Sequence, residues 1–158
     1  MKNLRWLIIA LLCISAGVTL GASPKDEYLS FWQKVKEQKL DEAAMHLFPI
    51  EDAEFLGKHK ELLKINAAML QEGTLKVDVV DSKIQNRWAF LVVHISVTQG
   101  AKTSDSIQYE IMALDGDTWK HVFKQKAEDP SLNKHSKDDF IVLEKWWQAN
   151  RTKYREAK

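Results

Sequence analysis

The chain has 158 residues, of which 45% are apolar and 28% are charged, a composition typical of a single folded domain. Its 23 basic and 22 acidic side chains leave a formal charge of +1, and this balance does not support nucleic-acid binding, which needs a clearly basic face. The chain has a single cysteine, which excludes an intrachain disulfide.

The first 22 residues have the three-part pattern of a secretory signal peptide. Two basic residues precede the apolar run of residues 6–14, and small residues follow it as far as Ala22. The run is shorter than the roughly 20 residues of a membrane-spanning helix, and the alternative to cleavage is an uncleaved anchor. We expect cleavage after Gly21 or Ala22, export to the periplasm or the extracellular space, and no membrane contact afterwards. The remaining 136 residues contain no cysteine, so the exported domain must be stabilised by its core alone.

Three helices are predicted to follow, over residues 24–38, 41–48 and 52–71. Ser23 is a suitable N-cap for the first helix, and Pro24 suits its first turn. The first and third helices each carry apolar residues at helical spacing along one face. These residues are Tyr28, Phe31, Trp32 and Val35 in the first helix, and Phe55, Leu56, His59, Leu62, Leu63, Ile65, Met69 and Leu70 in the third.

From residue 74 onward, the hydrophobic period changes to that of a strand. Four strands are predicted as an antiparallel meander, over residues 74–83, 88–98, 104–114 and 118–124. Asp115-Gly116 is a strong hairpin signal between the last two strands. A further helix is predicted over residues 138–158. The predicted fold class is α+β, with N-terminal helices packed on a curved, cone-like four-stranded sheet and a C-terminal helix.

Alternation along the strands predicts two faces of the sheet, and the N-terminal helices should cover the more apolar one. This first face is predicted to carry Leu75, Val77, Val79, Ala89, Leu91, Val93, Ile95, Val97, Ile107, Tyr109, Ile111, Ala113, Trp119, His121 and Phe123. The strand at residues 88–98 is also apolar on the second face, so the C-terminal helix or a second copy of the chain should cover it. The third alternative is a patch left in water. In a homodimer the interface would include Trp88, Phe90, Met112, Trp146 and Trp147.

Two stretches of the sequence are similar to a known superfamily. YLSFWQKVKEQKLDEAAMHLF at residues 28–48 and LDGDTWKHV at residues 114–122 resemble the opening helices and closing strand of nuclear transport factor 2-like domains, which are cone-shaped α+β folds. The resemblance covers residues 25–125 and is closest to exported bacterial members of unassigned function, some of them lumazine-binding-like. It implies a domain over residues 23–125 and a mostly helical extension over residues 126–158. The superfamily includes isomerases, dehydratases and non-catalytic binding modules, so membership alone does not decide the function.

The resemblance implies a ligand pocket between the first face and the helices. The side chains expected to line it are Tyr28, Trp32, His59, Tyr109 and Trp119. An isomerase-type pocket needs a carboxylate base and hydrogen-bond donors in apolar surroundings, and Asp81, Tyr109 and His121 are the candidates. Each of the three also has a simpler interpretation, as a solvated turn residue, a core tyrosine and a histidine at the edge of the core.

No motif in the sequence points to a metal or a cofactor. The five histidines have neither the i, i+4 nor the His-x-His spacing of a metal site, and a glycine-rich phosphate-binding loop is missing. We therefore expect no metal and no cofactor. The first hypothesis is a non-catalytic exported domain that binds a small apolar ligand or a protein partner. The alternatives are a small isomerase, dehydratase or hydrolase, and a structural homodimer.

Overall fold

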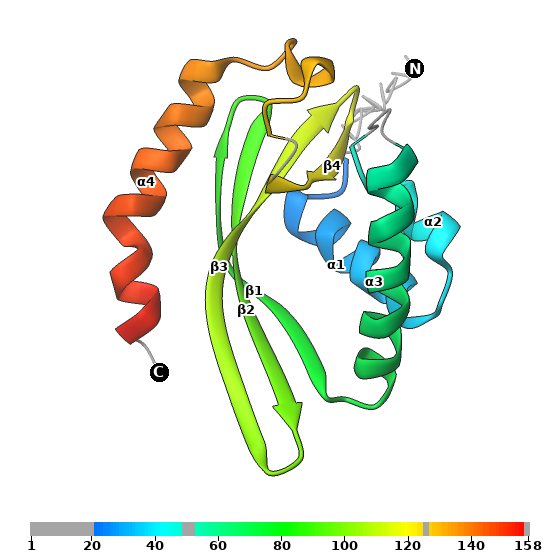
Figure 1. Cartoon of the computed structure of the whole chain (residues 1–158). Coiled ribbons are helices and arrows are strands. Elements are labelled where there is room, and N and C mark those ends of the chain that lie inside the picture. The colour runs from blue at the N-terminus through cyan, green and yellow to red at the C-terminus, as the bar shows by residue number, and fades with distance from the viewer. Residues whose placement is uncertain (1–20, 49–52, 125–126, 157–158) are drawn as a thin grey trace, which may run out of the picture.

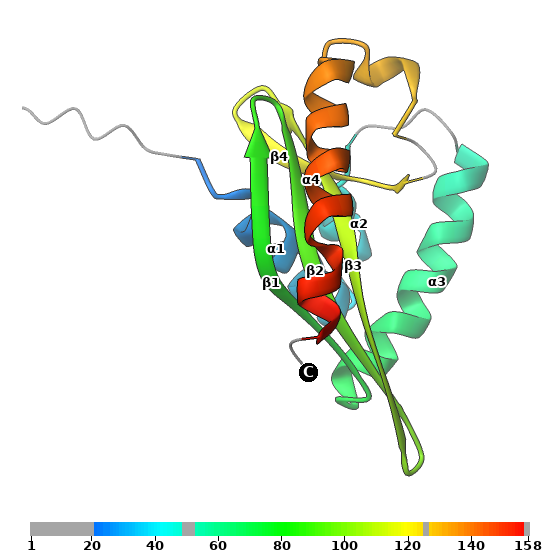
Figure 2. The same ribbon diagram turned by 90° about the vertical axis from the view of Figure 1, so that its left-hand side faces the viewer.

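The structure is a computed structural model that describes residues 21–48, 53–124 and 127–156. Within these residues, four α-helices and a four-stranded antiparallel sheet form an α+β fold, as predicted, and the sheet is open. The elements are α1 (Pro24–Lys36), α2 (Leu40–Ala44), α3 (Ala53–Gln71), β1 (Leu75–Gln85), β2 (Trp88–Gln99), β3 (Lys102–Asp115), β4 (Thr118–Val122), the short 3-10 helix η2 (Pro130–Leu132) and α4 (Lys137–Glu156). The sheet is the middle layer, with α1, α2 and α3 on one side and α4 on the other (Figure 1; Figure 2). Nearly all of the predicted signal peptide, residues 1–20, lies outside the described residues.

Helix α1 begins where the sequence predicts, because both halves of a capping box form at its N-terminus. Asp26 N donates to Ser23 Oγ, and Ser23 N donates to Asp26 Oδ2, both at 3.2 Å. The helix buries Tyr28, Phe31 and Val35 along one stripe. This stripe packs α1 against the first face of the sheet and against α3.

The second helix is shorter than predicted, because α2 ends at Ala44 rather than at residue 48. The residues that follow pair with the edge of the sheet instead. Phe48 N donates to His121 O, and His121 N donates to His46 O, both at 2.8 Å. These bonds satisfy backbone groups that a longer helix would have used, and they attach the segment after α2 to β4.

Helix α3 ends as predicted before Gly73, whose φ of 73° is the left-handed conformation of a helix stop. Its apolar face is narrower than predicted. Leu63 and Ala67 are buried, whereas Leu62 and Ile65 are more than half exposed. The helix therefore contributes one narrow stripe to the core and leaves these two side chains in water.

The strands pair in the order β1-β2-β3-β4, which confirms the predicted meander. Each connection is a two-residue loop that contains a residue with positive φ, the conformation favoured in tight hairpins. These residues are Asn86, Gly100 and Gly116. Turn chemistry encoded in the sequence thus sets the length of every hairpin.

The predicted faces are right for β2 and β4 but wrong for β3. Because the loop after β2 has two residues, Ala89 pairs with Met112 and Phe90 pairs with Ile111. Each odd-numbered residue of β2 thus lies on the same face as an even-numbered residue of β3. The residues of β3 that consequently lie on the second face, and not on the first, are Ile107, Tyr109, Ile111 and Ala113. Met112 and Glu110 take their place beneath the helices.

A β-bulge at Val80 changes the face of β1 halfway along the strand. Val79 pairs with Val93 on the first face, but Asp81 pairs with Val92 on the second. Regular alternation would have placed Asp81 on the first face, where the sequence analysis expected it.

Helix α4 of the same chain covers the second face of the sheet, which was the first of the three alternatives. Leu143 is fully buried and Trp147 nearly so, in one cluster with Phe90, Ile111 and other residues of the second face. The sheet is therefore buried on both faces along the first half of β2, which explains why that strand is apolar throughout.

Polar contacts hold both ends of α4 against β1 and its hairpin. At the first turn, Asp139 Oδ1 accepts from Gln85 Nε2 at 3.0 Å and from Asn86 Nδ2 at 2.9 Å. These hydrogen bonds lower the pKa of Asp139. Near the C-terminus of α4, the Tyr154 hydroxyl donates to Asp81 Oδ2. The helix is thus positioned at both ends as well as along its apolar stripe.

Candidate functional site

The three residues considered for catalysis do not meet. Asp81 and Tyr109 lie on the second face, whereas His121 lies on the first face beneath α1. Asp81 accepts a hydrogen bond from Tyr154, and Tyr109 stacks on Phe90 with ring centroids 4.6 Å apart. Because the sheet separates His121 from the other two side chains, the three cannot act together on one ligand.

His121 instead forms a buried pair with Glu110. His121 Nε2 lies 3.1 Å from Glu110 Oε2, and the two side chains are 6% and 12% exposed. Gln108 Nε2 donates to Glu110 Oε1 at 2.7 Å, and Lys124 Nζ lies 3.7 Å from the same oxygen. Burial raises the pKa of Glu110, but the hydrogen bond and charge of His121, together with Lys124, outweigh burial and leave the pKa below its usual value. Glu110 is therefore a structural carboxylate already engaged by three partners.

Aromatic rings fill the part of the first face where the sequence predicts a ligand pocket. Of the residues predicted to line it, those that lie on this side of the sheet are Tyr28, Trp32, His59 and Trp119. The Tyr28 ring lies 5.2 Å from the His121 ring and 6.3 Å from the Trp32 ring, measured between centroids. Burial, and then the charge of Glu110, raise the pKa of Tyr28. Tyr28 is thus a core residue that touches its neighbours ring against ring.

The residues predicted for a homodimer interface are used inside the chain. Trp88, Phe90 and Trp147 are buried between the sheet and α4, and Met112 is buried on the first face. Trp146, on α4, is half-buried. A second copy of the chain cannot reach Trp88, Phe90 and Trp147 while α4 stays in place, nor Met112 beneath the N-terminal helices.

Three polar side chains connect α1 to the segment after α2. Glu27 Oε2 lies 2.7 Å from His46 Nδ1, and Ser30 Oγ lies 3.5 Å from His46 Nε2. The chain of contacts from Glu27 through His46 to Ser30 matches the carboxylate, base and nucleophile of a hydrolase triad. The serine–histidine separation, however, exceeds the roughly 2.6–3.2 Å over which a general base takes a proton. We interpret the group as a structural link between α1 and the segment after α2.

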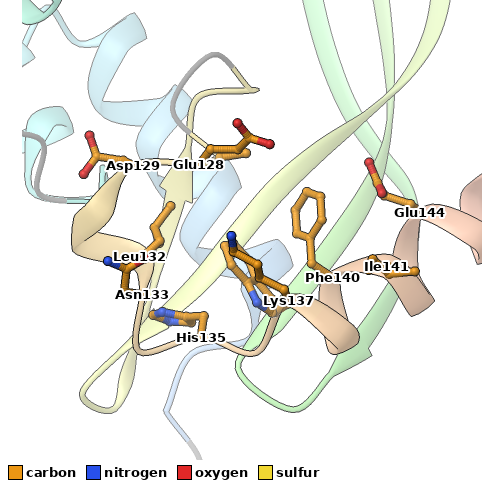
Figure 3. Close-up of a pocket in the computed structure, with 11 residues that line it drawn as sticks. Glu128, Asp129, Leu132, Asn133, His135, Lys137, Phe140, Ile141 and Glu144 are labelled. Carbon is orange, nitrogen blue, oxygen red and sulfur yellow. The ribbon is translucent and has the colours of Figure 1, made fainter.

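A cleft of about 510 Å³ opens between the loop that carries η2 and the first half of α4 (Figure 3). The apolar part of its wall is formed by Trp88, Ala127, Leu132, Phe140 and Ile141. The Trp88 ring centroid lies 4.9 Å from that of His135 and 5.0 Å from that of Phe140. The volume falls in the range of small-molecule sites, about 300–1,000 Å³, and the aromatic wall is typical of them.

The charged groups around the cleft are mainly acidic. Glu128, Asp129 and Glu144 bring three carboxylates, against one amine from Lys137. Asp129 also caps η2, because its Oδ1 accepts from Ser131 N at 3.0 Å. In Figure 3, Glu128 is drawn on the loop and Glu144 on α4, with Phe140 between them. A bound molecule would thus meet acidic groups from two different elements.

His135 is the most buried polar residue of this wall, at 6% exposed. Its Nε2 lies 3.0 Å from the carbonyl oxygen of Leu114, which can only accept, so Nε2 carries the proton of this bond. Its Nδ1 is buried and has no hydrogen-bond partner in the described part of the chain. In the neutral ring this nitrogen is an acceptor.

Sequence reasoning missed this cleft, because three separate segments form it. Trp88 comes from β2, Leu132 and His135 from the loop after β4, and Phe140 from α4. A local signal for the loop was present, since Asp129 followed by Pro130 is the N-cap and first position of a helix. No local pattern, however, shows that this loop lies beside Trp88.

No family model and no curated protein matches the chain. Among solved structures, the chain is similar to a SEC-C motif containing protein from Rhodopseudomonas palustris, with 11% identity and a TM-score of 0.46. The match covers 64% of this chain and 76% of that one. None of these comparisons supports nuclear transport factor 2-like domains, so the resemblance drawn from the sequence is wrong. A TM-score this low carries no argument about the function of the present chain.

Two further features of the described residues concern membranes and metals. In this part of the chain, no helix is both long enough and apolar enough to span a membrane. The same residues contain no group of three or more His, Cys, Asp or Glu side chains placed to hold a metal ion.

Proposed function

We propose that the chain is a non-catalytic binding domain and that a small ligand with an apolar body binds in the cleft between η2 and α4. The observation that carries this proposal is the concave, aromatic wall around about 510 Å³, with several polar groups at its margin. The division of Asp81, Tyr109 and His121 between two faces of the sheet favours binding over catalysis.

The proposed site is tested with phenethyl alcohol, a neutral probe with one aromatic ring, in an NMR titration of the whole chain. We expect the probe to shift the indole N–H signal of Trp88 and the ring signals of Phe140. The Ile141→Trp variant should fill the cleft and abolish these shifts, because Ile141 lines it. Val142→Trp is the matched control, since Val142 is the next residue of α4, is exposed to a similar extent and does not line the cleft. Equal binding by the two variants would show that the probe does not occupy the cleft.

We also propose that the domain works in the periplasm or outside the cell. The support for this is the signal-peptide pattern of residues 1–22 and the lack of cysteine in the rest of the sequence. N-terminal sequencing of the protein recovered from the exported fraction should begin at Ala22 or Ser23. A protein that stays in the cytoplasm with Met1 intact would refute export.

A further inference from the structure

We propose that the ligand of the cleft is an organic amine, that is, a small cation with an apolar body. This inference rests on the proposed function, because it assigns the ligand class of the same cleft. Charge, hydrogen bonding and aromatic character of the wall each contribute a separate argument.

The charge argument comes from the acidic margin. Glu128 and Glu144 are exposed and line the cleft, and neither makes a hydrogen bond or an ion pair within the described part of the chain. Lys137 is the one basic side chain that lines the cleft in that part. A cationic ligand would supply the partner that these two carboxylates lack, whereas an anionic ligand would be repelled by both.

The hydrogen-bond argument comes from His135. Its Nε2–H is used by Leu114 O, and its Nδ1 is an acceptor buried without a partner in the described residues. This nitrogen has no exposed surface, so a ligand does not reach it, and with Nε2–H already used His135 offers the cleft no N–H donor. The carboxylates of Glu128 and Glu144 can only accept hydrogen bonds, so the wall has more acceptors than donors. A ligand with several N–H donors fits such a wall better than a carboxylate or an ether.

The aromatic argument concerns the floor of the cleft. The ring centroids of His135 and Phe140 lie 4.9 Å and 5.0 Å from the centroid of Trp88. Trp88 is itself held in place, because its Nε1 donates to Ser136 O at 3.0 Å. Aromatic rings attract a cation through their negative faces, and they also bury the hydrocarbon part of an amphipathic ligand.

Three probes with the same phenyl body separate the ligand classes: phenethylamine, phenethyl alcohol and hydrocinnamate. We expect NMR titration of the whole chain to give phenethylamine a Kd at least about tenfold below that of the alcohol, and hydrocinnamate the weakest binding. The double variant Glu128→Gln, Glu144→Gln should bring the Kd values of the amine and the alcohol within about threefold of each other. Both residues are exposed, so the variant should fold normally. Glu61→Gln is the control, because Glu61 pairs with Lys64 on α3, across the sheet from the cleft.

Each outcome separates this inference from the proposed function. If the alcohol binds in the cleft as tightly as the amine, the ligand class is wrong and the binding site stands. If hydrocinnamate binds most tightly, the charge of Lys137 determines the ligand, and the inference is overturned. If Glu61→Gln removes the amine preference as fully as the double variant, the preference comes from overall charge and not from the cleft. If none of the probes shifts the cleft signals, both the inference and the proposed function fail.

Discussion

Replacing Leu143 by alanine tests how α4 covers the second face of the sheet. Leu143 is fully buried and lies in one cluster with Phe90, Ile111 and Trp147. Truncation of a buried leucine costs about 2–5 kcal/mol, from lost transfer free energy and from the cavity left behind. Because large rings surround this site and cannot collapse easily into the space, we expect about 3–4 kcal/mol in the free energy of unfolding.

Urea denaturation followed by tryptophan fluorescence measures this loss. For a domain of this size, about 1 kcal/mol corresponds to roughly 3 °C in Tm, so Leu143→Ala should lower the Tm by about 10 °C. The matched control is Val142→Ala, one residue earlier on α4, whose side chain is 45% exposed and whose loss should cost less than about 0.5 kcal/mol.

Two results would refute the reasoning. Equal small losses in the two variants would mean that α4 does not pack on the sheet through Leu143. A Tm of the unmodified chain that rises with protein concentration would mean that a second copy contributes to the cover, because association stabilises by mass action.

Three further predictions concern single contacts. The lowered pKa of Glu110 stabilises the fold above its unfolded pKa of about 4.3, and this stability is lost as the pH falls through the lower folded value. Glu110→Gln should therefore be less stable than the unmodified chain at neutral pH and should lose less stability as the pH falls. Urea denaturation of both proteins at each pH measures this, and parallel pH profiles would contradict it. Tyr154→Phe should lower the free energy of unfolding by about 0.5–1 kcal/mol, because the hydrogen bond from Tyr154 to Asp81 is partly exposed to water. The variant should also speed amide hydrogen exchange in the last turn of α4. Unchanged exchange would show that this bond does not hold the helix. Gly73→Ala should cost about 1 kcal/mol from the φ of 73° alone, since nothing lies within 4 Å of the new Cβ; a Tm equal to that of the unmodified chain would exclude this strain.

The elements that the sequence predicts correctly depend on local chemistry. The capping box of Ser23 and Asp26 fixes the start of α1, and the glycine after α3 fixes its end. Alternating apolar residues and the hairpin at Gly116 define the strands and their order. Each of these signals lies within a few residues of the feature that it specifies, so a single sequence is enough to find it.

The elements that the sequence predicts wrongly depend on pairing between distant segments. The end of α2 is decided by backbone bonds between Phe48 and His121, and the face of β3 by the length of one loop. The resemblance to a known superfamily failed for a related reason. An amphipathic helix and a glycine hairpin are features of many α+β folds, so the quoted stretches identify elements and not their arrangement. The cleft is also non-local, since β2, the loop with η2 and α4 each supply part of its wall.

At the bulge at Val80, the residues of β1 that face the helices change from odd-numbered to even-numbered. Before it, Val79 points toward the helices, and after it, Asp81 points toward α4, where it binds Tyr154. Deleting Val80 would remove the bulge and let Asp81 follow Val79 in regular alternation, so every later side chain of β1 would keep its face and Gln85 would still reach Asp139. Deleting Val80 and Asp81 together would instead turn the later side chains of β1 to the opposite face. The strand thus contains one residue more than its pairing with β2 needs, and the bulge absorbs that residue.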